Sequence, residues 1–159
     1  MKHILPAILL MLLFCSCGQK VILDQDRTFA NATWMRFEPE NFEVNATNTD
    51  DCYNFYITAH IDTALFRDNG LPLMLEMVSP DGETRTIFPS LVLRNHEGNW
   101  LGEFNDGVLT VQQMVRQFYF FNSVGTHTIH LSQRTSKYQI EGIRDINFRI
   151  EKAKIEYPE

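Results

Sequence analysis

Apolar and polar side chains alternate with a period of two residues along most of this chain, and that pattern restricts it to β-structure. The alternation is clearest from Cys52 to Asp62, where every second side chain is apolar and its neighbours are polar or half-polar. A strand with one buried and one wetter face is typical of an antiparallel sheet that packs on another sheet. The apolar face of this segment comprises Phe55, Ile57, Ala59 and Ile61.

Turn-forming residues separate further segments of the same kind. Pro80-Asp81-Gly82 predicts a tight turn, because proline sets φ for the first corner and glycine accepts positive φ after it. About eight strands at this spacing predict an all-β domain, an antiparallel β-sandwich of the immunoglobulin-like or jelly-roll-like type. The expected strands are Trp34–Phe37, Phe42–Val44, Cys52–Asp62, Leu71–Ser79, Glu83–Leu93, Thr126–Arg134 and Ile143–Glu151, with one more near Phe118–Phe121.

The segment Val108–Phe121 fits two different periods. Leu109, Val115 and Phe118 are spaced so that they can share one helix face. Phe118–Phe121, in contrast, consists of strand-forming aromatic residues. We expect a short helical or irregular piece that runs into a strand.

The amino-terminal residues have the pattern of an export signal. Lys2 precedes an apolar run, Ile4–Phe14, which as a helix would reach only about half of the hydrocarbon core of a membrane. The run therefore predicts a secretory signal peptide over residues 1–16 and not a membrane span. Ser16 supplies the small residue before the cut, in a pattern that resembles a bacterial lipobox, so Cys17 is the predicted lipidation site. An ordinary secretory signal without lipid is the alternative.

The remaining chain has the size of one domain. We expect a lipid anchor and tether over residues 17–31, in which Val21–Leu23 can form a short first strand, and a β-sandwich domain over residues 32–159. After cleavage and acylation Cys52 is the one remaining thiol, so no intrachain disulfide is expected. A buried, inert thiol is favoured over a nucleophile. The acidic residues Asp24 and Asp26 do not directly follow the lipidated cysteine, which favours a periplasm-facing anchor.

No group of residues predicts a metal site. His127 and His130 are an odd number of residues apart on an expected strand, so they point to opposite faces. His60 and Asp62 share a strand face but lack a defined third ligand. A half-exposed polar face accounts for them, and we expect no metal and no cofactor.

Signals for catalysis are equally weak. The sequence contains no Gly-x-Ser-x-Gly elbow and no glycine-rich phosphate loop. Glu76 lies on a mainly apolar strand, where we expect it to pair with Arg85 or Arg94. One such carboxyl group is not the carboxylate pair of a glycoside hydrolase. The sequence therefore predicts a protein that is not an enzyme.

Aromatic residues are the remaining candidates for function: twelve Phe, five Tyr and two Trp. Trp100 lies beside turn residues, while Phe118, Tyr119 and Phe121 place rings on both faces of a strand. These rings form either a contact surface for carbohydrate or protein, since aromatic side chains contribute much binding energy at interfaces, or a part of the core. The net charge of −6, with dispersed acidic residues, provides no electrostatic reason to bind nucleic acid or an anionic lipid surface.

Beyond the short lipoprotein leader, several segments follow one another in a recognisable order. They are Trp34, Ser79-Pro-Asp-Gly82, Gly98-Asn-Trp-Leu-Gly102, Gly125-Thr-His-Thr-Ile129, Gln133-Arg134 and Glu141-Gly-Ile-Arg-Asp-Ile-Asn-Phe-Arg-Ile-Glu-Lys152. Together they resemble the gliding-motility lipoprotein GldH family of Bacteroidetes, over essentially the full mature chain.

The resemblance implies a non-catalytic lipoprotein of the cell envelope, bound to the bilayer through an acylated amino-terminal cysteine. It also implies envelope proteins as partners, in particular the machinery of gliding or of the associated secretion system. It implies tight backbone at Gly102, Gly125 and Gly142. A carbohydrate-binding β-sandwich module of the envelope is the alternative function.

Overall fold

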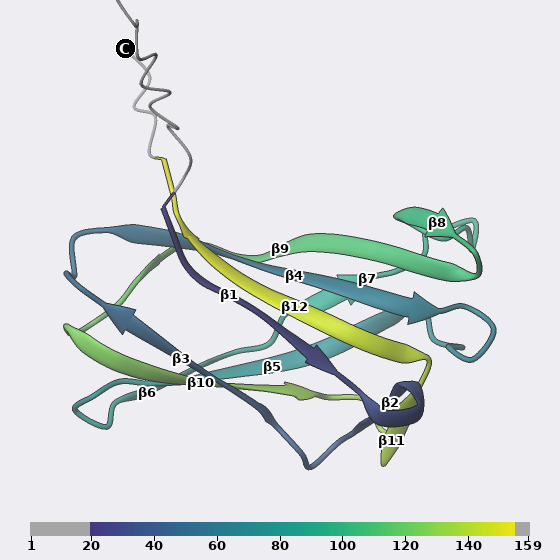
Figure 1. Ribbon diagram of the computed structural model, residues 1–159, viewed down its shortest axis with the longest axis horizontal. Coiled ribbons are helices and arrows are strands. Elements are labelled where there is room, and N and C mark those ends of the chain that lie inside the picture. Colours follow the sequence, from purple (N-terminus) through teal and green to yellow (C-terminus); the bar gives the residue numbers. More distant parts are fainter. Residues whose placement is uncertain (1–19, 155–159) are drawn as a thin grey trace, which may run out of the picture.

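The computed structural model describes residues 20–154, which form two antiparallel sheets that face each other (Figure 1). The first sheet has the strand order β1 (Val21–Thr28), β12 (Ile143–Lys152), β4 (Cys52–Asp62), β9 (Val108–Phe120) and β8 (Glu103–Asn105). The second has the order β3 (Glu40–Ala46), β10 (Gly125–Gln133), β5 (Gly70–Val78) and β6 (Thr84–Ile87), and β7 (Ser90–Val92) also pairs with β5. A short 3-10 turn, η1 (Ala30–Ala32), precedes β2 (Thr33–Met35), which pairs with β11 (Gln139–Glu141).

The predicted all-β sandwich is confirmed, but residues 20–154 contain twelve strands where the sequence suggested about eight. The expected strand Glu83–Leu93 is divided into β6 and β7, and the additional strands β8 and β11 are three residues long, which is too short to show a period. The first strand is longer than its three aliphatic residues suggest. It runs from Val21 to Thr28 and pairs along its length with β12, so these residues of the predicted tether belong to the sandwich.

Strand β9 is extended from Val108 to Phe120, so the expectation of a short helical or irregular piece before the strand is wrong. The strand pairs with β4 along its whole length, but the register shifts around Phe55. The buried residues Leu109, Val111 and Tyr119 are separated by even numbers of residues, so ordinary strand alternation directs all three inward. The helix-like spacing arose because the exposed apolar residues Met114 and Phe118 lie on the opposite face from the inward-facing Leu109 and Val115.

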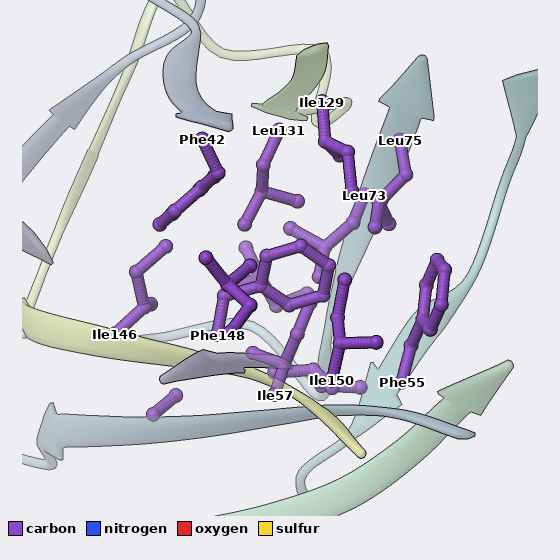
Figure 2. Close-up of a cluster of buried hydrophobic side chains, with 14 of the residues drawn as sticks. Phe42, Phe55, Ile57, Leu73, Leu75, Ile129, Leu131, Ile146, Phe148 and Ile150 are labelled. Atoms are coloured by element: carbon purple, nitrogen blue, oxygen red, sulfur yellow. The ribbon is translucent and has the colours of Figure 1, made fainter. Parts of the chain in front are cut away.

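The core lies between the two sheets, and Figure 2 shows its central part. Phe148 of β12 packs with ring-centroid distances of 5.1 Å to Phe42 and 5.8 Å to Phe55. Burial of each such side chain contributes roughly 1.5–3 kcal/mol to folding. The labelled residues are Phe55, Ile57, Ile146, Phe148 and Ile150 from the first sheet and Phe42, Leu73, Leu75, Ile129 and Leu131 from the second.

Two predicted tight glycines illustrate how closely the backbone segments approach. Gly142 precedes β12 with φ +95°, and a Cβ atom there would lie 2.6 Å from the backbone nitrogen of Phe66. Gly102 has φ +137°, and its Cβ would lie 2.3 Å from the carbonyl oxygen of Thr110. Both positions require the conformation and the absent side chain of glycine.

The described chain begins and ends at the same end of the sandwich, because the Lys152 N–H donates to the Lys20 carbonyl at 2.8 Å. We call this the terminal end; it also carries loops 47–51, 79–83 and 121–124 (Figure 1, left). The opposite, or far, end carries β2, β11 and loops 63–69 and 93–102.

The two long sides of the sandwich are closed differently. On one side the Arg27 guanidinium of β1 donates to the Asn41 carbonyl of β3 at 2.6 Å and lies 4.3 Å from the Phe42 ring centroid. On the other side the Gln113 amide of β9 accepts from the Val92 N–H at 3.0 Å and donates to the Val92 carbonyl at 2.6 Å. A side-chain amide thus takes the place of a peptide group and connects the two sheets.

Replacing Gln113 with Ala should lower the free energy of unfolding by about 1–2 kcal/mol, because both Val92 backbone groups lose their partner. Urea unfolding monitored by circular dichroism measures the change. Gln112→Ala is the matched control: this neighbour is exposed and makes only a 3.3 Å contact to Thr58, so its cost should stay within about 0.5 kcal/mol. Equal losses in the two variants would contradict the bridging role of Gln113.

Candidate contact surface

The ionisable residues discussed above are engaged in separate surface pairs. The His60 Nδ1 atom lies 2.5 Å from an Asp145 carboxylate oxygen, while Asp62 accepts from the Arg144 guanidinium at 2.9 Å. Although His60 and Asp62 share a face of β4, they therefore have different partners. The Arg144 hydrogen bond holds the pKa of Asp62 below its ordinary value, with further help from the Ala64 N–H. Within residues 20–154 no three His, Cys, Asp or Glu side chains gather as metal ligands.

The two histidines of β10 lie on opposite faces, as predicted. His127 is buried and its Nε2 atom lies 2.8 Å from the Ser123 carbonyl oxygen, whereas His130 is directed toward Asn41 on the outer face. Cys52 is also buried, at 3% exposure, so its thiol is not presented to a substrate.

The predicted pairing of Glu76 with Arg85 or Arg94 is wrong. Arg85 binds Glu83 at 2.8 Å, and Arg94 stacks over the Trp100 ring at 3.5 Å. Glu76 instead lies across the sheet from Thr86. Glu83 is only two residues before Arg85, so in extended chain the two side chains point to the same side and can form this ion pair.

The four aromatic residues predicted as a contact surface do not form one surface. Tyr119 and Phe121 are 5% and 1% exposed and pack edge to face at 5.1 Å, so both rings belong to the core. Burial accordingly raises the pKa of the Tyr119 hydroxyl. Trp100 is half-buried at the far end beneath Arg94, and Phe118 alone is exposed, at 41%, near the terminal end.

A different set of aromatic residues is gathered on the outer face of the second sheet, toward the far end. Phe37, Phe88 and Tyr138 are 72%, 66% and 63% exposed, although they come from three separate connections. The Phe37 and Tyr138 ring centroids are 6.0 Å apart. The Arg36 guanidinium lies 5.5 Å from the Phe37 ring and that of Arg134 lies 5.7 Å from the Phe88 ring. We call these five residues the arginine–aromatic patch.

Local backbone contacts hold the patch together. The Arg36 N–H donates to the Tyr138 carbonyl at 2.9 Å, which ties the turn after β2 to the loop before β11. The Arg134 N–H donates to the Pro72 carbonyl at 2.8 Å, which fixes the end of β10 against β5. The two junctions therefore position Arg36, Phe37, Tyr138 and Arg134, and Phe88 joins them from the segment between β6 and β7.

A hollow of about 210 Å³ lies between the two arginines. Among its lining residues, Gln133 is fully buried, and its Oε1 atom accepts from the Thr135 N–H and hydroxyl at 2.9 and 2.8 Å. The Gln133 Nε2 donor has no hydrogen-bond partner among residues 20–154. The complete lining is Arg36, Phe37, Pro39, Met74, Ser132, Gln133 and Arg134.

The chemistry of the patch suits contact with another macromolecule. Neither Arg36 nor Arg134 has a carboxylate partner within residues 20–154. Both guanidinium groups can therefore donate hydrogen bonds to a carboxylate of a binding partner. Arginine and exposed aromatic residues are also the residue types that dominate binding energy at protein interfaces. The hollow is smaller than an ordinary small-molecule pocket. The arrangement therefore resembles an interaction hot spot.

Sequence reasoning did not find this patch. Phe37 and Tyr138 stand in short turn segments, and no period connects them with Phe88. A weak signal was present, because Phe37 is three residues from buried Trp34 and so falls on the opposite face of an extended chain.

The structure defines the class of protein as a single β-sandwich with an exposed contact patch. Residues 20–154 include no helix that is long and apolar enough to cross a membrane. The chain belongs to the GldH lipoprotein family, whose model matches residues 21–150, from the start of β1 almost to the end of β12. It is 24% identical over 149 residues to a protein of Christiangramia forsetii (strain DSM 17595 / CGMCC 1.15422 / KT0803) named "Gliding motility lipoprotein GldH homolog". The match covers 89% of this chain and 90% of that protein.

Family membership confirms the resemblance seen in the sequence, and it makes this chain a lipoprotein of the gliding-motility type with a lipid-anchored location in the cell envelope. The family is not a known enzyme family. The predicted lipidation site, Cys17, lies outside the residues that the structure describes.

The lowered pKa values of Asp51, Asp62, Asp81 and Glu83 predict a loss of stability in acid. A carboxyl group whose folded-state pKa is depressed contributes stability above its unfolded pKa of about 4, and this contribution disappears as the pH falls through the folded value. Thermal unfolding between neutral and strongly acidic pH should show this decline. Asp62→Asn should reduce the steepness of this decline, because it removes the carboxylate that binds Arg144. Glu103→Gln should not, because Glu103 is exposed and has no ion-pair partner within residues 20–154. An unchanged slope in Asp62→Asn would contradict the assignment.

Proposed function

We propose that this protein is a non-catalytic envelope lipoprotein, held by an acyl group on Cys17, that binds another envelope protein through the arginine–aromatic patch. The observation that carries the proposal is the gathering of three highly exposed rings and two guanidinium groups without carboxylate partners, within residues 20–154, on one rigid face. The partner surface that fits this patch presents carboxylate groups among apolar side chains, because these complement the arginines and the rings.

The position of the patch supports this function. Both ends of the described chain lie at the terminal end, whereas Phe37 and Tyr138 lie toward the far end, beside β2 and β11. The sandwich is long in the strand direction, since an eleven-residue strand such as β4 extends for about 35 Å. An anchor at Cys17 would therefore leave the patch directed away from the membrane and open to a partner. A periplasm-facing anchor, and a partner within the gliding or secretion machinery, are part of the proposal.

Carbohydrate binding is the second candidate. Phe37 and Tyr138 lie side by side, with ring centroids 6.0 Å apart, and both can stack on a sugar ring. The unpartnered Gln133 Nε2 donor at the adjacent hollow can bind a hydroxyl group. The two candidates differ in the role of the arginines, which a neutral sugar does not require.

Intact mass and membrane fractionation of wild type and Cys17→Ala test the anchor. Wild type should start at Cys17, carry acyl mass and sediment with membranes, because the acyl chains partition into the bilayer. Cys17→Ala should lose both the added mass and the membrane location. A protein that lacks acyl mass in wild type would remove the lipid anchor from the proposal.

Site-specific photocrosslinking in the native cells tests the patch. A benzophenone side chain at position 37 should form a defined crosslinked product, and Arg134→Gln should reduce its yield by about tenfold, as expected for the loss of one charge-assisted contact of about 1.4 kcal/mol. The same probe at position 104 on β8 is the matched control, since Phe104 is 59% exposed but lies outside the patch. Arg116→Gln controls for the loss of a surface charge elsewhere.

Equal crosslinking at positions 37 and 104, unaffected by Arg134→Gln, would contradict a specific protein contact. If purified envelope polysaccharide protects position 37 and the arginine substitution has no effect, the carbohydrate-binding function is supported instead.

A further inference from the structure

We propose that Phe118, Phe120 and Val124, at the terminal end of the sandwich, insert into the interfacial layer of the bilayer and form a second membrane contact beside the acyl chains. This inference rests on the proposed acylation of Cys17. It concerns a surface separate from the arginine–aromatic patch.

The length of the connection to Cys17 provides the first argument. Strand β1 begins at Val21, so only Gly18, Gln19 and Lys20 separate the lipidated residue from the sheet. The four steps from the Cα atom of Cys17 to that of Val21 span at most about 14 Å when fully extended. The headgroup layer on one side of a bilayer is itself roughly 5–8 Å thick. The terminal end would therefore be held against the membrane surface and not at a distance from it.

The register of the first sheet places the three apolar residues at this same end. Lys152 pairs with Tyr53, which pairs with Tyr119, and Cys52 then pairs with Phe120. Phe120 is thus level with the last residues of the described chain, three strand spacings or about 15 Å from β1. Strand β4 lies between β12 and β9 in this sheet, so the end of β9 is one strand removed from the end of β12. Val124 follows in the loop between β9 and β10.

The side chains at this end are exposed although they are apolar. Phe118 is 41%, Phe120 45% and Val124 60% exposed, while Tyr119 between the two phenylalanines points into the core. Alternation along the strand thus sends two aromatic rings outward together. Aromatic side chains are favoured at the interface between lipid and water.

The backbone at Phe118 is fixed in an unfavourable conformation that keeps its ring outside. Phe118 has φ +51°, in the left-handed region that bulky residues avoid. Its N–H is bound at 3.1 Å by the Oδ1 atom of Asn54, a side chain that is only 7% exposed. Such strain persists only where the surrounding structure determines it, and it is concentrated at functional positions.

The charges around this surface favour an apolar contact over an electrostatic one. Lys20, Lys152 and Lys154 lie at the terminal end, but so do the acidic residues of loops 47–51 and 79–83, and Lys152 already pairs with Asp51 at 2.6 Å. With mixed charge, the contact should form on zwitterionic lipid and should be insensitive to salt.

Tryptophan fluorescence of the mature acylated protein in phosphatidylcholine vesicles tests the inference. Phe120→Trp and Val124→Trp each place a reporter on the proposed contact, and Phe88→Trp is the matched control on the patch. Brominated phosphatidylcholine quenches only tryptophan that enters the lipid layer, and wild type gives the background from Trp34 and Trp100. We expect additional quenching at positions 120 and 124, unchanged by added NaCl, and none at position 88. Near-ultraviolet circular dichroism shows that each variant is folded.

Two outcomes would overturn the inference and are distinguishable by intact mass. If Cys17 carries the acyl group but positions 120 and 124 are quenched no more than position 88, the membrane contact is absent and the anchor remains. If the mature chain carries no acyl group, the anchor and the contact that depends on it both fail.

Discussion

Burial of one apolar face of each sheet against the other is the interaction on which the rest of the structure depends. Phe148 connects the two layers through its contacts with Phe42 and Phe55, and the side chains around it are almost fully buried. Because side chains alternate along a strand, each residue that packs inward sends its neighbours outward. The packing of the core thereby determines which residues are available for binding. Tyr119 is buried, whereas its neighbours Phe118 and Phe120 are exposed.

Along the two long sides of the sandwich, side chains form hydrogen bonds with backbone groups of the opposite sheet. Gln113 supplies a side-chain amide to the backbone of Val92, and Arg27 reaches from β1 to the Asn41 carbonyl of β3. Such bridges satisfy backbone groups at sheet edges, which otherwise invite pairing with other chains. The two exposed apolar surfaces then have different surroundings. One lies beside the described chain ends, and the other carries guanidinium groups toward the opposite end, which suits a lipoprotein that contacts a membrane and a partner at once.

Much of the fold could be predicted because strand alternation is a local property. The boundaries of β4, β5, β10 and β12 agree with the sequence to within one or two residues, and the burial of Ile146, Phe148 and Ile150 was expected from their spacing. Strand β9 was misread because Met114 and Phe118 are apolar although they lie on the exposed face, and the sequence alone does not show which apolar residues the sandwich leaves exposed. Glu76 was assigned the wrong partner because the register of β5 with β6 places Arg85 opposite Met77, on the other face of the sheet from Glu76.

The sequence by itself determined the β-class of the domain, its apolar faces and its family, since each is encoded in adjacent residues or in their order along the chain. The tertiary structure decided which aromatic rings face solvent and which charges lack a partner among the described residues. Arg36, Phe88 and Arg134 come from three separate connections, and only the packing of β2, β10 and the segment between β6 and β7 brings them to one surface. A binding surface of this kind is a property of the closed sandwich, because each side chain gains its neighbours only when both sheets have paired and packed.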